Sequence, residues 1–116
     1  MIPQYFIDSS GLKYAQEDIK EPPNAEEIKT AEAWIKLHCR KRKTVNKDHS
    51  SYGLKHKAEN WGSFLNKHFK TDIFSSYIAN GAFIQAAVNL GFMPCQTDKW
   101  INANFCMSVH ASDYGL

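Results

Sequence analysis

Apolar residues recur with helical spacing in three parts of the chain. The first part spaces them at intervals of three and four: Ile28, Ala31, Ile35 and Cys39. This is the period of a helix that packs one face against a core. Asn24, followed three residues later by Glu27, is typical of a helix start. We therefore predict a helix over residues 25–41, with Arg40 and Lys41 in its last turn, where cations favour the helix dipole.

The second part predicts a helix over about residues 50–61. Leu54, Ala58 and Trp61 lie on one face of it, and Gly53 weakens it by about 1 kcal/mol relative to Ala. Apolar residues at 64, 65 and 69 fit a short further helix. The chain would then turn at residues 70–72.

The third part, residues 80–90, is apolar around most of a helix: Phe83, Ile84, Ala87, Val88 and Leu90. Asn80 suits the N-cap, and Gly91 suits the left-handed position after the last turn. A helix with so little polar surface belongs in the centre of a core.

The last part of the chain changes period. Residues 101–110 alternate between apolar and polar side chains, which indicates a strand. The other strand-like stretch is QYFI at residues 4–7, so we expect the two chain ends to pair. The predicted fold is therefore mainly α: a small single-domain bundle of three to four helices with a short C-terminal strand paired with the N-terminal arm. Two prolines at residues 22 and 23 separate that arm, residues 1–23, from one α-rich domain, residues 24–116.

The composition fits one domain of ordinary globular type. The chain has 116 residues, of which 43% are hydrophobic and 22% charged. No apolar run approaches the roughly 18–20 residues that span a bilayer, and the start lacks the pattern of a signal peptide, so we expect a cytoplasmic protein with no membrane contact. Three cysteines at unrelated spacings argue against a disulfide framework and for reduced thiols.

Positive charge is concentrated in the middle of the chain. Residues 38–70 hold nine Lys and Arg against two acids, a net charge of +7, whereas residues 1–37 carry −3 and residues 71–116 carry −2. An anionic partner would therefore meet the centre of the sequence. The alternative is a well-solvated helix end and loop with no binding role.

The residues offer no recognisable catalytic or metal-binding pattern. Neither paired Cys-x-x-Cys nor His-x-x-x-His occurs, and such spacings are usual at zinc sites. No nucleophile elbow surrounds a serine or cysteine, and the six glycines are too dispersed for a phosphate loop. We expect no enzyme activity, no metal and no cofactor.

The stretch RKRKTVNKDHSSYGLKHK, residues 40–57, combines the residue types that contact nucleic-acid backbones. Long cations, hydroxyl groups and a helix N-terminus all serve phosphate recognition. The candidate binding residues are Arg40, Lys41, Arg42, Lys43, Lys47, Ser51, Tyr52, Lys55, His56 and Lys57.

Three segments between Thr44 and Phe105 carry a resemblance: SSYGLKHKAE, YIANGAFIQAAVNLGF and NANFCMS. They are similar to small, functionally uncharacterised accessory proteins of phages and integrated mobile elements. The resemblance implies a genetic setting and transfers no activity. It directs attention to Tyr52, Lys55 and His56, which core packing does not explain.

Two functions suit such a setting. The first is a small non-enzymatic nucleic-acid-binding accessory or regulatory protein that uses residues 40–57 to contact the backbone of DNA or RNA. The second is a stoichiometric inhibitor that binds a host protein machine, such as a nucleic-acid-guided defence complex, in the manner of an anti-CRISPR protein. The sequence does not fix the oligomeric state.

Overall fold

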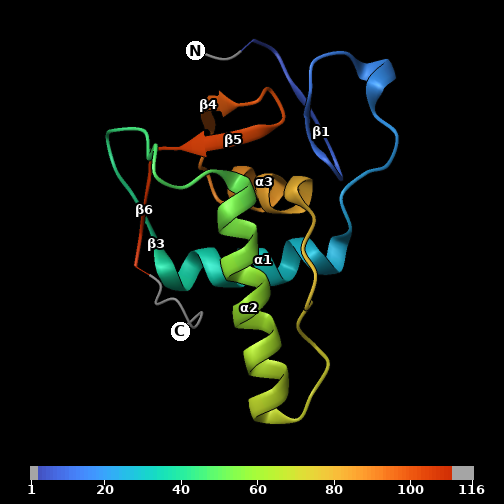
Figure 1. The fold of residues 1–116 in the computed structure, drawn as a ribbon, viewed down its shortest axis with the longest axis vertical. Helices are drawn as coiled ribbons and strands as arrows, with labels where there is room; N and C mark the ends of the chain where they lie inside the picture. Colours follow the sequence, from blue (N-terminus) through green and yellow to red (C-terminus); the bar gives the residue numbers. More distant parts are fainter. Residues whose placement is uncertain (1–2, 111–116) are drawn as a thin grey trace.

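A computed structural model describes residues 3–110 of the chain. Three helices and six short strands follow one another in the order β1 (Phe6–Asp8), β2 (Gly11–Lys13), α1 (Ala25–His38), β3 (Cys39–Lys41), α2 (Ser51–Phe69), α3 (Asn80–Asn89), β4 (Pro94–Asp98), β5 (Asn102–Phe105) and β6 (Met107–Val109), with a 3-10 turn at Gln16–Asp18. In Figure 1, α1 and α3 lie one above the other, α2 crosses them, and β1, β4 and β5 form the upper end.

The prediction of a mainly α bundle is wrong, because the strands form three two-stranded antiparallel sheets: β1–β2, β3–β6 and β4–β5. The fold is therefore a small α+β domain. The predicted pairing of the chain ends is also wrong. The N-terminal strand closes a hairpin with β2, in which Ile7 faces Leu12, and this local pairing costs less loop-closure entropy than joining the two ends would.

The predicted C-terminal strand is divided between two sheets. Its first half, β5, pairs with β4, and its second half, β6, pairs with β3. The strand β3 replaces the last turn predicted for the first helix. Arg40 and Lys41 therefore lie on an extended strand opposite Ser108 and Met107. The prediction failed here because a three-residue strand has no period of its own and depends on its partner.

The start of α1 agrees with the prediction. The side chain of Asn24 accepts hydrogen bonds from the backbone N–H groups of Glu26 and Glu27 at 2.9 and 3.1 Å. The two helices predicted between residues 50 and 69 are a single helix, α2, whose carboxyl half extends beyond the body of the molecule (Figure 1). Asn66 holds the returning loop by hydrogen bonds to both backbone groups of Phe74.

The core lies between the three helices and β5, as the apolar character of α3 predicts. Its largest fully buried side chains include Trp34 of α1, Leu54 of α2, Phe83 of α3 and Phe105 of β5. The predicted N-cap is displaced by one residue: Ala79 occupies that position and Asn80 begins α3. Within residues 3–110, no helix combines the length and apolar character needed to cross a membrane.

Candidate functional site

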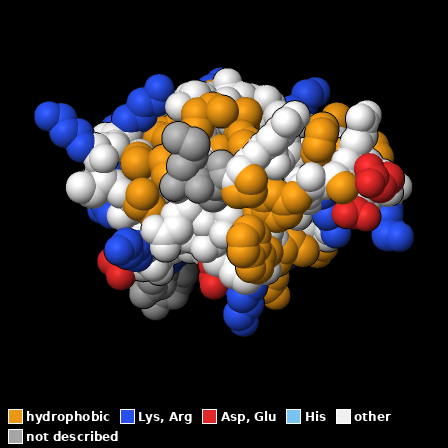
Figure 2. Space-filling model, turned by 90° about the horizontal axis from the view of Figure 1, so that it is seen from above, with side chains coloured by type: hydrophobic (Ala, Val, Ile, Leu, Met, Phe, Trp, Pro, Cys, Tyr) orange, Lys and Arg blue, Asp and Glu red, His pale blue; other side chains and the backbone are white. Residues whose placement is uncertain are grey.

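A cleft of about 390 Å³ opens where the amino ends of α2 and α3 meet two hairpin turns. Its lining includes Ser10, Tyr52, Lys55, Tyr77, Asn80 and Lys99. Ser10 comes from the β1–β2 turn, and Lys99 comes from the β4–β5 turn. Seen from above in Figure 2, hydrophobic side chains gather on the end of the molecule that these turns form, with Lys and Arg side chains around the rim.

Asn80 is the polar centre of this region. Its side-chain oxygen accepts a hydrogen bond from the Ser51 hydroxyl at 2.7 Å, and its amide nitrogen donates to the Ser10 carbonyl and to the Asn102 side chain, each at 3.0 Å. The Ser51 oxygen in turn accepts from the N–H of Ala103 at 3.0 Å. These bonds fix α2, α3, β5 and the β1–β2 turn relative to one another.

Gly81 allows the β1–β2 turn to lie directly on the first turn of α3. The N–H of Gly81 donates to the Ser9 carbonyl at 3.0 Å, and a Cβ atom at this position would lie 1.6 Å from the Asp8 carbonyl oxygen. The Asp8 carboxylate fixes the turn by accepting bonds from the N–H and hydroxyl of Ser10 at 2.8 and 2.6 Å. Burial opposes the charged form of Asp8, but the hydrogen bonds from Ser10 and Lys20 and the charge of Lys13 outweigh it and hold its pKa below the usual value.

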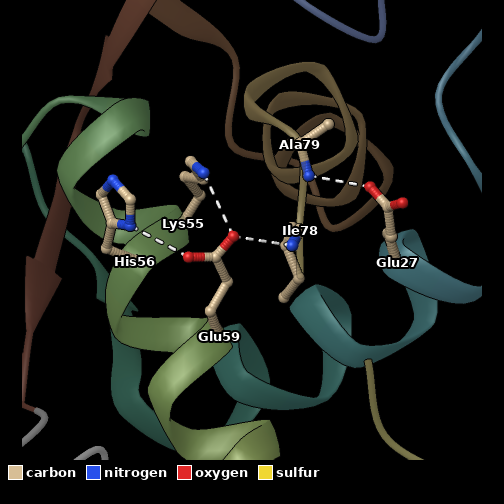
Figure 3. A network of polar contacts seen from close by, with 6 residues as sticks. All are labelled: Glu27, Lys55, His56, Glu59, Ile78 and Ala79. Atoms are coloured by element: carbon tan, nitrogen blue, oxygen red, sulfur yellow. Dashed lines mark hydrogen bonds and ion pairs between the residues drawn. The ribbon is translucent and has the colours of Figure 1, made fainter. Parts of the chain in front are cut away.

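Lys55 and Glu59 form a nearly buried ion pair beneath the cleft (Figure 3). Their side chains are 7% and 12% exposed, and the Lys55 nitrogen lies 3.1 Å from Glu59 Oε2. The same Oε2 accepts a hydrogen bond from the N–H of Ile78 at 2.8 Å, and Oε1 lies 2.9 Å from His56 Nδ1. Glu59 therefore joins the middle of α2 to the segment that enters α3.

A second carboxylate, from α1, acts on the same segment. Glu27 Oε1 accepts the N–H of Ala79 at 2.8 Å, and Figure 3 shows Glu27 and Glu59 approaching residues 78 and 79 from opposite sides. Ala79 has no capping side chain of its own. The two glutamates thus take the place of an N-cap, at the end of the helix where negative charge is favourable.

Aromatic side chains stand around the Lys55 ammonium group. The Lys55 nitrogen lies 5.3 Å from the ring centre of Tyr52 and 4.9 Å from that of Tyr77. Both rings are largely open to solvent, at 52% and 61% exposure. Lys99 lines the cleft from the β4–β5 turn, where it and the next residue, Trp100, have positive φ angles of 54° and 64°. Such angles are unfavourable for bulky residues and often mark functional turns.

Trp100 is 67% exposed and makes an edge contact with Tyr14 at a centroid distance of 5.7 Å. A tryptophan that faces solvent on a strained turn is unusual for a core-building residue. The cleft itself is lined by the two exposed tyrosines and by Lys99, and Trp100 follows Lys99 on the same turn.

The ten predicted binding residues fall into two groups. One group is the basic segment, residues 40–47, which contains five exposed cations: Arg40, Lys41, Arg42, Lys43 and Lys47. The segment runs from β3 to the amino end of α2 (Figure 1). The other group lies on the first two turns of α2.

Part of the basic segment serves the local fold. Arg42 donates to the carbonyls of Thr44 and Val45 at 2.8 and 2.9 Å, and Arg40 donates to the Cys39 carbonyl. Lys41 lies over the Phe92 ring at 5.7 Å. The exposed side chains of Lys43 and Lys47 make no hydrogen bond or ion pair within residues 3–110, so they are the cations best placed to meet a partner.

On α2, only some predicted residues face solvent. Ser51 and Lys55 are buried, at 0% and 6% exposure, and their polar atoms already have partners within the fold. Tyr52 and His56 are exposed, and Lys57 is half-buried. Periodicity places Lys55 away from the apolar stripe, but Glu59 and the two tyrosine rings provide a site in which its charge is compensated.

The sequence interpretation did not assign Tyr77 and Lys99 to a binding site. These two residues lie in connecting segments with no periodic pattern, and the fold brings them to the cleft from distant positions. Tyr52, Lys55, Asn80 and Asn102, which lie in the three segments quoted in the sequence analysis, all line this cleft.

No group of three or more metal-binding side chains lies together in the described part of the chain. The arrangement instead offers stacking surfaces, a shallow cleft with amide and hydroxyl groups, and cations nearby. No protein-family model matches the chain, and no curated protein or solved structure is significantly similar to it.

Proposed function

We propose that this chain is a cytoplasmic, non-enzymatic protein that binds single-stranded nucleic acid. Unpaired bases stack on the aromatic side chains around the cleft, and the basic segment holds phosphates. The observation that carries the proposal is the pair of exposed aromatic residues, Tyr52 and Tyr77, that line one cleft together with the exposed Lys99.

Aromatic side chains beside cations are the usual means by which proteins bind single strands. Each stacked base contributes about 1–3 kcal/mol, and the backbone follows a positively charged surface. Tyr52 and Tyr77 leave more than half of their surfaces accessible. The cleft volume of about 390 Å³ lies within the range of small-ligand sites, so an unstacked base fits its dimensions.

The positions of the cations support a path for the backbone. Lys47 precedes the amino end of α2 by four residues, and Lys99 lies on the opposite edge of the cleft. Residues 38–70 carry a net charge of +7. Acidic residues lie on both flanks: Glu21 and Glu27 line a recess beyond Tyr77, and Asp48 and Asp98 line a recess with Lys47. The phosphate path of the proposal therefore depends on Lys43, Lys47 and Lys99.

The resemblance to accessory proteins of phages and mobile elements agrees with the proposal. Residues from all three of its segments surround the cleft or hold its floor together. A nucleic-acid-binding role also suits the genetic setting that the resemblance implies.

The proposal is tested by fluorescence anisotropy with labelled single-stranded DNA, single-stranded RNA and duplex DNA. Tyr52→Ala and Tyr77→Ala should each weaken single-strand binding by about 1–3 kcal/mol. Lys43→Ala/Lys47→Ala should make the negative slope of log K against log salt shallower by about 0.7 for each phosphate that the two lysines no longer neutralise.

The matched control is Lys29→Ala/Lys67→Ala, which removes the same charge from exposed positions on α1 and α2 away from the cleft. An equal loss of affinity in the control would show that only net charge matters. Undiminished binding by both tyrosine variants, with melting temperatures unchanged, would reject the cleft as the base-binding site.

A second candidate function is the binding of a host protein, as an inhibitor of a nucleic-acid-guided defence complex would require. The observation in its favour is the projecting end of α2 and the following loop, where Phe69 and Ile73 are 65% and 71% exposed. Phe64→Ser/Phe69→Ser should leave oligonucleotide affinity unchanged and should abolish co-purification with a protein target if this surface is used.

A further inference from the structure

The sulfur atoms of Cys95, in β4, and Cys106, which lies between β5 and β6, are 3.2 Å apart. The register of the β4–β5 sheet shifts between Pro94, which faces Phe105, and Gln96, which faces Asn104. Cys95 is the extra residue at this irregularity. A β-bulge redirects the side chain of the residue that it adds, and here it places the Cys95 thiol beside Cys106.

Both thiols are reachable from solvent. Cys95 and Cys106 are half-buried, and they border a shallow recess of about 220 Å³ that is also lined by Lys41 and Arg42. The hydrogen bond with the Cys95 sulfur raises the pKa of Cys106. Burial and the charge of Cys95 raise this pKa further, and the nearby Arg42 guanidinium opposes the rise. The recess is large enough to admit a small oxidant to the pair.

The third cysteine is buried. Cys39 is 5% exposed, and burial raises the pKa of its thiol to about 12. Since the thiolate is the reactive form, Cys39 is expected to be inert. The chain therefore contains an accessible pair of thiols and one protected thiol, which serves as an internal control.

We propose that Cys95 and Cys106 form a dithiol site that is oxidised reversibly to an intramolecular disulfide by small disulfide oxidants such as oxidised glutathione. In the first step, one thiol loses its proton and its sulfur attacks a glutathione sulfur, which forms a mixed disulfide and releases one glutathione thiolate. In the second step, the other cysteine thiolate attacks the protein sulfur and releases the second glutathione. The protein loses two protons and two electrons, and oxidised glutathione is reduced to two glutathione molecules.

The change in geometry that the reaction requires is small. A disulfide needs a sulfur–sulfur distance of about 2.05 Å, so the two side chains must approach by little more than an ångström from their positions in the structure. The bond would close the hairpin that carries Lys99 and Trp100 at its tip. This inference concerns a different part of the molecule from the proposed cleft and holds whether or not the chain binds nucleic acid.

The test is thiol counting on the folded protein. Purified protein is incubated with oxidised glutathione, unreacted thiols are alkylated after denaturation, and the intact mass is measured. The expected result is a monomer that has lost two hydrogens and takes up one alkyl group, whereas dithiothreitol treatment restores uptake of three. Peptide mapping should identify a fragment in which residues 95 and 106 are joined.

Single-cysteine variants complete the design. Cys39→Ser should retain full formation of the disulfide, and Cys95→Ser and Cys106→Ser should each abolish it while circular dichroism shows an intact fold. Uptake of three alkyl groups by the treated wild-type protein would overturn the proposal. So would stable glutathione adducts on separate cysteines, a disulfide-linked dimer, or a bond that involves Cys39.

Discussion

The ion pair between Lys55 and Glu59 gives a direct test of how the cleft is supported. Glu59→Gln removes the charge that compensates the Lys55 ammonium, which is 7% exposed and 3.1 Å from Glu59 Oε2. Removal of one partner from a fully buried pair costs about 3–5 kcal/mol. The two tyrosine rings keep part of the stabilisation, at about 0.5–2 kcal/mol for each cation–π contact. We therefore expect a loss of about 2–3 kcal/mol in the free energy of unfolding.

The double variant Lys55→Met/Glu59→Gln separates charge compensation from the loss of packing. It removes both charges, so it should be less destabilised than the sum of the two single variants, by about 1–2 kcal/mol, within the usual range for residues in contact. The exposed Lys67 on the same helix supplies a control, since Lys67→Met should change stability by less than about 0.5 kcal/mol.

Equilibrium unfolding in urea, followed by circular dichroism, measures the free energy of unfolding of Glu59→Gln, Lys55→Met, the double variant and Lys67→Met. The comparison requires equal m-values, since a changed m-value signals a different unfolded or native state. If the two single substitutions add to within about 0.3–0.5 kcal/mol of the double variant, the residues do not interact energetically. That result would refute the reasoning that Glu59 stabilises the buried ammonium.

Three further predictions concern the stability of the fold and of the site. Gly81→Ala should lower the free energy of unfolding by about 3 kcal/mol or more, because its methyl group would overlap the β1–β2 turn. Gly53 has open space around it, so Gly53→Ala should raise the free energy of unfolding by about 0.5–1 kcal/mol. Chemical denaturation of both variants checks the contrast. Burial lowers the pKa of His38, and the charge of Arg40 lowers it further. The stabilisation by the neutral His38 side chain should therefore be full above about pH 6.5 and should fall as the pH drops below that value. Melting temperatures of the wild type and of His38→Asn, measured between pH 5 and 8, should converge at the acidic end. Asn80→Ala leaves the Ser51 hydroxyl without its acceptor and should cost about 1–3 kcal/mol, and an unchanged unfolding midpoint would contradict the role given to this hydrogen-bond network.

The sequence predicts those elements whose signals are local. The start of α1 follows from Asn24 and the acids after it, and the apolar run of α3 places that helix in the core. The end of α1 is different, because Cys39–Lys41 becomes a strand only when β6 is available as its partner. The alternation of residues 101–110 indicates a strand, but it does not reveal the division into β5 and β6 or their partners β4 and β3, and these pairings change the fold class.

The candidate site shows the same division. The basic segment is visible as a run of charge, but the burial of Lys55 depends on Tyr77, which approaches from a loop more than twenty residues away. The spacing of Lys55 and Glu59 by four residues is a local signal for an ion pair on a helix, although it does not reveal that the pair is buried. The proximity of Cys95 and Cys106 depends on an irregularity in the β4–β5 register, which no spacing of cysteines indicates.

The central claim is that the aromatic cleft and the basic segment together bind unpaired nucleic acid. The measurement that tests it most directly is the affinity of the wild-type protein for a single-stranded oligonucleotide and for its duplex at several salt concentrations. The account predicts tighter binding of the single strand, with log K falling linearly against log salt by about 0.7 for each phosphate that the protein neutralises. Equal affinity for the duplex would contradict base stacking in the cleft, and the absence of binding at low salt would contradict the proposed function as a whole.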